Sequence, residues 1–349
     1  MRYLITGGAG FIGSHLADAL VARGDSVLIV DDLSTGSLEN IVDAMASGRA
    51  EFVEGSVCDQ GLVDECMEQA DACFHLASAV GVKLIVDRSV ESLSRSVRGS
   101  QLVVEGAHRL GRRLLFASTS EIYGKNGDTA LGEHSDRILG PPSIARWSYS
   151  TAKAFGEAIS LGYHREREAD TVVARLFNAV GPRQTGAYGM VLPRFVTQAL
   201  AGENLTVYGD GSQSRCFSHV YDTTRALVML MDEEGARGEA FNVGRSSEIT
   251  ILDLALKVIE RTESTSGIRT VPYDEAYGEG FEELGRRRPD TTALEQRTGW
   301  RPTRTVEDAI DDVAAFERLR TERARMAGLD GDLTAVAEES ATVDPSLEA

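Results

Sequence analysis

The chain has 349 residues, of which 42% are hydrophobic and 26% charged, a composition typical of a soluble globular protein long enough for two domains. Its formal net charge of −18 disfavours binding to nucleic acid or to an anionic membrane, but it does not exclude a locally basic site for a small anion. The first residues run directly into a glycine loop and the apolar runs are short, so we predict neither a signal peptide nor a membrane span. The four cysteines lack metal-type spacing, so we expect free thiols in a cytoplasmic protein and no metal site.

The first half of the chain alternates short apolar runs with helical patterns, as expected for successive β-α-β units. We predict helices at 12–23, about 90–110 and 149–165. The predicted strands lie at 2–6, 26–30, 51–54, 72–76, 113–117 and 171–176. This alternation predicts an α/β fold with a doubly wound parallel sheet of the Rossmann type.

After about residue 178 the loops lengthen and glycine and proline cluster. Short strands at 205–208 and 240–243 mix with helices at 192–201, 222–231 and 251–261. We therefore predict an NAD-binding Rossmann domain over 1–178 and a smaller C-terminal α/β substrate domain over 179–318. Residues 326–349 are small and acidic, and we expect a disordered tail there.

The segment Thr6–Gly13 follows the first predicted strand, opens the first predicted helix and spaces its glycines as GxxGxxG. Glycines allow a dinucleotide pyrophosphate to approach the backbone, and the helix N-terminus offers it free N–H groups. Asp31, at the end of the second strand, is placed to accept hydrogen bonds from the adenosine ribose. Asp32 adds to the repulsion of a 2′-phosphate, so we predict NAD rather than NADP. The other expected cofactor contacts are Gly7, Gly10, Phe11, Ile12, Gly13, Val57, Asp59, Leu76, Ala77 and Ser78.

Tyr149 and Lys153 lie four residues apart on a predicted helix and therefore share one face. We expect the ammonium group and a bound nicotinamide to lower the pKa of Tyr149. The phenolate can then take a proton from a sugar hydroxyl while hydride leaves for NAD.

A polar segment, Ser118–Gly124, follows the fifth predicted strand, at the sheet edge where ligands bind in open parallel sheets. Thr119 is a candidate hydrogen-bond partner of the reacting hydroxyl, and Glu121 a candidate acid or base. The alternative is a polar cap between strand and loop.

From residue 1 to about residue 312 these motifs resemble the extended short-chain dehydrogenase/reductases, a family of NAD-dependent nucleotide-sugar epimerases, dehydratases and decarboxylases. The resemblance rests on Thr6–Gly13, the Asp-Asp-Leu-Ser-Thr-Gly of 31–36, the Tyr149/Lys153 pair, Asn178 and Gly181-Pro182-Arg183. It implies a homodimer that pairs the helices at 90–110 and 149–165 with those of its partner. It also implies a UDP-sugar substrate bound by Asn178, Leu192, Tyr208, Arg215 and Arg288. Ser96 departs from the pattern, because the family usually carries asparagine there.

The resemblance leaves the reaction open among chemistries that all begin with oxidation at C4 of the sugar. Thr119-Ser120-Glu121 resembles the Thr-Ser-Glu of UDP-glucuronate decarboxylases, with Ser120 as a proton relay and Arg215 balancing charge. The segments 146–150, 215–217 and 277–281 resemble the decarboxylase domain of the bifunctional enzyme that modifies lipid A. The alternatives are a UDP-sugar 4-epimerase and a 4,6-dehydratase, since GDP-mannose 4,6-dehydratases also carry Thr-Ser-Glu. A non-catalytic NAD-binding protein is disfavoured because Thr119, Tyr149 and Lys153 are all present.

Overall fold

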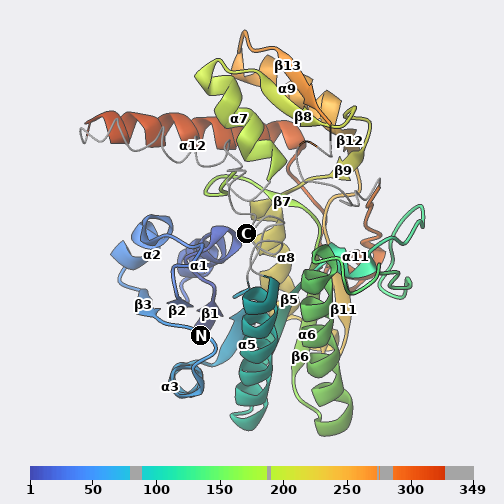
Figure 1. The fold of residues 1–349 in the computed structure, drawn as a ribbon. Coiled ribbons are helices and arrows are strands. Elements are labelled where there is room, and N and C mark those ends of the chain that lie inside the picture. The colour runs from blue at the N-terminus through green and yellow to red at the C-terminus, as the bar shows by residue number, and fades with distance from the viewer. Residues whose placement is uncertain (79–88, 187–189, 273–274, 276–285, 327–349) are drawn as a thin grey trace, which may run out of the picture.

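The computed structural model describes residues 1–78, 89–186, 190–272, 275 and 286–326 (Figure 1). The expected tail beyond residue 326 and the segment 277–281 lie outside these residues. No helix in the described ranges is long and apolar enough to cross a membrane.

Within the described residues, a sheet of seven parallel strands forms the centre of the molecule, in the order β11-β6-β5-β4-β1-β2-β3. Its strands are β1 (Arg2–Thr6), β2 (Ser26–Asp31), β3 (Ala50–Glu54), β4 (Ala72–His75), β5 (Arg113–Thr119), β6 (Thr171–Leu176) and β11 (Ala240–Val243). The order runs outward in both directions from β1, which confirms the predicted doubly wound Rossmann sheet.

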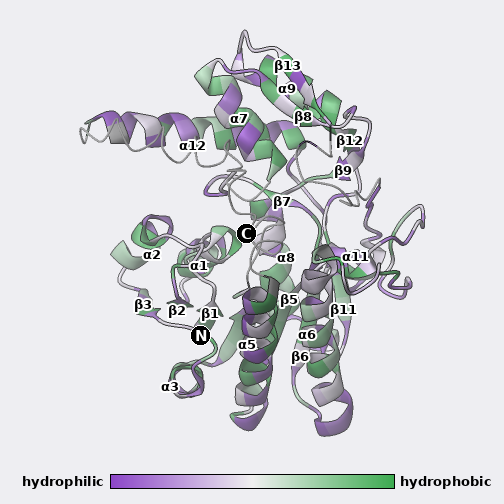
Figure 2. Cartoon of the chain, viewed as in Figure 1, coloured by the Kyte–Doolittle hydropathy of each residue, from purple (hydrophilic) through white to green (hydrophobic). Residues whose placement is uncertain are grey.

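Helices cover both faces of this sheet, and alternate residues along each strand pack into different cores. Tyr3 and Ile5 of β1 pack with α1 (Phe11–Arg23) and α8 (Val220–Asp232), whereas Leu4 packs with α3 (Gln60–Glu68) and α5 (Ser89–Arg109). Burial on both faces explains why these strands are continuous apolar runs. Two long helices, α5 and α6 (Arg146–Arg167), lie side by side on one face (Figure 1). Their outer ends are hydrophilic, in contrast to the central strands (Figure 2).

The smaller lobe has a separate hydrophobic core. Leu192 and Phe195 of α7 (Val191–Ala201) pack there against Leu254 of α9 (Ile251–Thr262) and Ile310 of α12 (Val306–Met326). Short paired strands complete the lobe: β7 (Ala179–Val180) with β10 (Ser218–His219), β8 (Leu205–Tyr208) with β13 (Ile268–Val271), and β9 (Ser214–Cys216) with β12 (Glu248–Thr250).

The two lobes are not consecutive in the sequence. After β6 the chain builds part of the small lobe, returns as α8 to pack on α1, and adds β11 beside β6. The strand at 240–243, expected in the second domain, is therefore an edge strand of the main sheet, so a boundary at residue 178 does not separate the lobes cleanly. Between β11 and α12, the short helix α11 (Thr292–Thr298) packs on β11.

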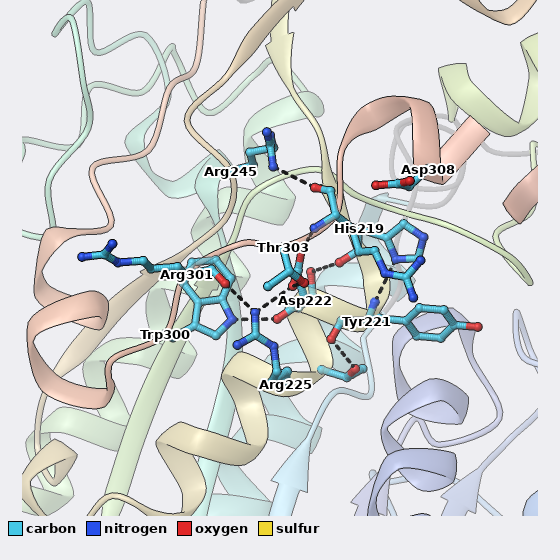
Figure 3. Close-up of polar contacts among 12 residues, drawn as sticks. His219, Tyr221, Asp222, Arg225, Arg245, Trp300, Arg301, Thr303 and Asp308 are labelled. Carbon is cyan, nitrogen blue, oxygen red and sulfur yellow. Dashed lines mark hydrogen bonds and ion pairs between the residues drawn. The ribbon is translucent and has the colours of Figure 1, made fainter. Parts of the chain in front are cut away.

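Asp222, in the first turn of α8, fastens the C-terminal segment to the Rossmann unit (Figure 3). Its carboxylate accepts hydrogen bonds from Thr303 N and Oγ1, Arg304 N and Arg225 Nη2, each at 2.8 Å. The Trp300 indole N–H donates to the Asp222 carbonyl at 3.0 Å. This junction fixes the chain immediately before α12, a helix that the sequence analysis did not predict.

Candidate active site

A cavity of about 760 Å³ follows the carboxyl ends of the central strands and extends between the two lobes. Most of the residues predicted for the site line it. They are Gly7, Gly10, Phe11, Ile12, Gly13, Asp31, Asp32, Val57, Leu76, Ala77, Ser78, Thr119, Ser120, Glu121, Tyr149, Lys153, Asn178, Leu192, Tyr208 and Arg215. The structure thus brings together side chains that lie up to two hundred residues apart in the sequence.

The glycine loop fits a dinucleotide pyrophosphate. Gly7 has a φ of +72°, and a Cβ at Gly13 would lie 2.2 Å from the Gly7 carbonyl oxygen, so both positions require glycine. The N-cap of α1 is Gly10, which offers no side-chain cap within the described structure. The first-turn N–H groups of α1 therefore face the cavity free to bind an anion.

Asp31 and Asp32 occupy the adenosine end of the cavity but have different partners. Asp31 is buried and accepts hydrogen bonds from Ala9 N at 3.0 Å and Leu33 N at 2.9 Å. Burial raises the pKa of Asp31, and these backbone donors oppose the rise. Asp32 forms an ion pair with Arg95 of α5. The expected second charge against a 2′-phosphate is therefore balanced by Arg95.

Two predicted site residues do not line the cavity. Asp59 is the N-cap of α3, and its carboxylate accepts hydrogen bonds from Gly61 N at 2.9 Å and Leu62 N at 3.2 Å. Arg288 is absent from the lining, whereas its neighbour Arg287 is part of it. Residues 286–288 are all arginine, so the sequence alone does not indicate which of the three side chains lines the cavity.

The Tyr149 and Lys153 side chains both reach the cavity from α6. Lys153 donates to the Ala117 carbonyl at 2.8 Å, and burial lowers its pKa to about 8. Burial and the Glu121 carboxylate raise the pKa of Tyr149, while a hydrogen bond with Thr119 lowers it. The expected lowering of the Tyr149 pKa by Lys153 is not found: burial is the largest cause of the shift, and it raises the pKa.

Glu121 lies in the 3-10 turn η2 (Ser120–Tyr123), directly after β5. Thr119 caps this turn by accepting a hydrogen bond from Glu121 N at 3.2 Å, and Ser150 Oγ donates to the Glu121 carbonyl at 2.8 Å. The Glu121 carboxylate forms an ion pair with Arg287, which is 7% exposed. Arg287 Nε is buried and has no hydrogen-bond partner within the described structure. Arg287 lines the cavity, so the pair places a guanidinium beside the Glu121 carboxylate there.

The other end of the cavity is lined by residues predicted to bind the substrate, which follow β6 in the chain. Asn178, in a left-handed conformation with a φ of +31°, donates from Nδ2 to the Cys216 carbonyl at 3.0 Å. Arg194 lies over the ring of Tyr208, with its guanidinium carbon 4.4 Å from the ring centroid. Arg215 lines the same region, so this end combines cations with an aromatic surface, as a nucleoside diphosphate requires.

Several lining residues were not predicted. Arg194 follows Leu192 on α7, and no motif distinguished it from an ordinary helix residue. Phe316, Glu317 and Arg320 reach the cavity from α12. At the position where the family usually has asparagine, Ser96 lies with its Oγ 3.4 Å from Ser78 Oγ, so a hydroxyl pair occupies this part of the wall. No group of His, Cys, Asp or Glu in the described ranges is arranged to hold a metal ion.

Comparisons with known proteins agree with this geometry. The family model for the NAD dependent epimerase/dehydratase family matches residues 3–244. A UDP-N-acetyl-alpha-D-glucosaminuronate decarboxylase of Bacillus cytotoxicus is 39% identical over 318 residues, covering 91% of this chain and 98% of that protein. UDP-glucuronic acid decarboxylase 2 of Arabidopsis thaliana is 35% identical, over 86% of this chain and 65% of the plant protein.

Among solved structures, a dTDP-glucose 4,6-dehydratase of Streptomyces venezuelae with NAD bound is similar, with a TM-score of 0.83 and 28% identity. The match covers 92% of this chain and 98% of that one. The sequence motifs, the sheet order and the cavity at its carboxyl edge all agree with these matches. The chain belongs to the NAD-dependent epimerase/dehydratase family of extended short-chain dehydrogenase/reductases.

Proposed function

We propose that this protein is an NAD-dependent UDP-hexuronate decarboxylase of the UDP-glucuronate type. The observation that carries the proposal is the Glu121–Arg287 ion pair beside Tyr149 in the cavity. The relatives from Bacillus cytotoxicus and Arabidopsis thaliana, both named as decarboxylases of uronate sugars, support the same reaction.

Oxidation at C4 makes the sugar a β-keto acid, which readily loses its carboxyl group. NAD, when bound, supplies the oxidant at C4. The glycine loop and α1 hold its pyrophosphate, while Asp31 binds its ribose. Tyr149 takes the proton from the C4 hydroxyl, and Thr119 hydrogen-bonds to Tyr149 and holds it in place. Lys153 contributes positive charge near the phenolate, anchored by its bond to the Ala117 carbonyl.

Arg287 is the cation we assign to the substrate carboxylate, because it lines the cavity beside Glu121 and Tyr149. The Glu121 carboxylate brings a like charge close to that group. Breaking the C5–C6 bond releases carbon dioxide, relieves this repulsion and leaves the electron pair in an enolate. Ser120 then relays the proton that replaces the carboxyl group at C5, and Arg215 balances the enolate charge.

Product analysis tests the proposal. The protein with NAD is incubated separately with UDP-glucuronate, UDP-N-acetylglucosaminuronate and UDP-glucose, and NMR and carbon dioxide release are measured. We expect a uronate to yield carbon dioxide and a UDP-pentose or its 4-keto form. Conversion of UDP-glucose to UDP-galactose without carbon dioxide from either uronate would replace the decarboxylase proposal with a 4-epimerase.

We also propose that the protein is a cytoplasmic homodimer assembled through α5 and α6. The two helices lie side by side on one face of the sheet, an arrangement that allows a partner's pair to complete a four-helix bundle. All four cysteines are free in the structure, which suits a reducing compartment.

A further inference from the structure

We propose that a buried polar network centred on Arg175 and Tyr123 is a positioning device, which keeps the Glu121–Arg287 pair in register with Tyr149 and Lys153. The inference rests on the proposed decarboxylation and assigns Tyr123 as a positioning residue for it. The network joins the elements that carry the two halves of the site.

The first link connects Arg175 of β6 to the catalytic helix. Its Nε donates to Glu157 Oε1 at 3.0 Å and its Nη2 to Glu157 Oε2 at 2.7 Å, a bidentate pair. Glu157 lies on α6 one helical turn beyond Lys153, which itself lies one turn beyond Tyr149. These three side chains share a face, so the Arg175 fork sets the rotation of α6 about its axis.

The second link connects Arg175 to the turn that carries Glu121. Arg175 Nη1 donates to the Tyr123 hydroxyl oxygen at 2.9 Å, and this hydroxyl donates to Asn242 Oδ1 at 2.7 Å. Tyr123 closes η2 two residues after Glu121 and is fully buried. The position of the Tyr123 ring therefore determines where the short turn presents the Glu121 carboxylate.

The third link reaches the segment that carries Arg287. Asn242 Nδ2 donates to the Leu131 carbonyl at 2.8 Å and to the Asp290 carbonyl at 3.0 Å. Leu131 in turn donates from N to the Arg288 carbonyl at 2.8 Å and accepts from Asp290 N at 2.9 Å. The backbone on the C-terminal side of Arg287 is thus tied, through Asn242, to the Tyr123 hydroxyl.

Stability alone is a poor explanation for this arrangement. Arg175 and Glu157 are 8% and 5% exposed, so both charges are removed from water at a desolvation cost that their attraction only roughly repays. A well-packed apolar pair fills such a position equally well. The ionic pair adds a fixed orientation, because the planar guanidinium holds Glu157 of α6 and Tyr123 of η2 in one geometry.

Loss of the network should displace the Glu121–Arg287 pair more than it displaces Tyr149 and Lys153. Tyr149 and Lys153 have additional anchors in Thr119 and the Ala117 carbonyl. The Glu121 backbone is also held by Thr119 and Ser150, whereas Arg287 comes from a segment that is tied to the Tyr123 hydroxyl through Asn242. Removing the Tyr123 hydroxyl should therefore displace the Glu121–Arg287 pair, while oxidation at C4 continues.

The test is Tyr123→Phe, with Tyr163→Phe on the outer part of α6 as a matched control outside the network. With UDP-glucuronate, Tyr123→Phe should slow carbon dioxide release about fivefold or more, the effect of losing a buried hydrogen bond. The absorbance of reduced cofactor should meanwhile rise, because oxidation outpaces decarboxylation. The control variant should show neither change. Unaltered carbon dioxide release in Tyr123→Phe would overturn the inference.

A binding measurement separates this inference from the proposed function. Calorimetry with the NADH-loaded protein, which cannot oxidise C4, gives the affinity for UDP-glucuronate relative to UDP-glucose, which carries a hydroxymethyl group in place of the carboxylate. Tyr123→Phe should lower that ratio, and an unchanged ratio counts against the positioning role even if the wild type releases no carbon dioxide. Absence of carbon dioxide from the wild type contradicts the proposed function alone.

The double variant Arg175→Met/Glu157→Leu distinguishes positioning from stability. We expect a melting temperature close to that of the wild type together with slowed carbon dioxide release. Full activity in a stable double variant would overturn the inference. If the double variant does not fold, the Tyr123→Phe measurements decide.

Discussion

The protein surrounding Tyr149 opposes the ionisation that its proposed task requires. Burial and the Glu121 carboxylate raise the pKa of its phenol, and only the Thr119 hydrogen bond acts in the other direction. The positive nicotinamide of bound NAD favours the phenolate. We therefore expect the pKa of Tyr149 to fall when NAD binds.

Replacing Tyr149 with phenylalanine removes the acid–base group and leaves the glycine loop unchanged. We expect turnover to fall by about 10²- to 10⁴-fold, the usual cost of losing such a group. The NAD dissociation constant should stay within about threefold of the wild type, since the pyrophosphate and ribose contacts remain. Fluorescence titration and steady-state kinetics measure the two quantities. Wild-type turnover in the variant would remove Tyr149 from the mechanism.

The buried Lys153 makes the free energy of unfolding depend on pH in the alkaline range. Its folded pKa of about 8 lies below the ordinary value of 10.5, so between these pH values the unfolded chain binds the extra proton. The cost of burying the charge is fully present below pH 8 and disappears as pH rises through this window. Relative to Lys153→Met, the wild-type free energy of unfolding should increase by up to about 3 kcal/mol from pH 8 to 10.5. Urea unfolding of both proteins tests this, and a difference that is constant or falls with pH contradicts it.

At the scale of elements, the site depends on where strands end and helices begin. Thr119 ends β5 and caps η2, and Gly10 precedes α1 without offering a side-chain cap in the described structure. Both junctions line the cavity, and we propose that the first presents side chains to the sugar and the second backbone N–H groups to the cofactor. The two junctions therefore perform different tasks at the same edge of the sheet.

A methyl group at Gly13 should disrupt the junction of β1 and α1. Its Cβ would lie 2.2 Å from the Gly7 carbonyl oxygen, so the loop must shift. We expect Gly13→Ala to lower NAD affinity by at least about tenfold and stability by about 1–3 kcal/mol. Gly106→Ala in α5 is the control, because its Cβ would have no neighbour nearer than 3.6 Å. It should stabilise the protein by about 0.4–1 kcal/mol. Equal NAD affinity in both variants would count against the close approach proposed at the loop.

The sequence predicted the strands of the Rossmann unit well, because strands buried on both faces are short, uninterrupted apolar runs. The bounds of β1, β6, β8 and β11 agree with the structure exactly. The lobe predicted for β11 was wrong, because its pairing with β6 is a tertiary contact that leaves no local signal in the sequence. Helix α12 was missed because the small Ala309 and Ala314 make up half of its buried core, among many charged residues.

Site residues in motifs of fixed spacing were predicted from the sequence. Those whose place in the cavity depends on tertiary packing were missed. The glycine loop and the Tyr149/Lys153 pair are local patterns, and both line the cavity. Arg287 was missed because adjacent arginines look alike until burial distinguishes them. Asp59 was selected as a cofactor ligand, but its carboxylate caps α3 instead.

At the scale of the whole molecule, the cavity exists only between two lobes that are held together. Asp222 of α8 accepts hydrogen bonds from Thr303 and Arg304 in the chain that leads into α12. The cofactor loop and the substrate lobe are therefore fixed to one framework, which suits a reaction that oxidises a sugar and later reduces it in place.

We predict that the protein assembles as a homodimer. We expect light scattering at micromolar concentration to give twice the chain mass of 37.6 kDa, with α5 and α6 forming the contact. Cross-linking through single cysteines placed on the outer face of α6, in a variant lacking the native thiols, should capture the dimer. A monomer across the concentration range, or cross-linking only through other surfaces, contradicts this arrangement.

β11 belongs to the main sheet but follows part of the small lobe in the sequence. This order limits where the chain can be cut or joined to a relative. A fragment ending near residue 178 would lack the strand that pairs with Val173–Leu176, together with the α8 residues that cover α1. It would expose an unpaired sheet edge and a bare apolar face, and we expect it to aggregate. Exchange of substrate lobes with a relative therefore needs several coordinated junctions, around α8 and β11, and a single crossover would leave both parents' cores incomplete.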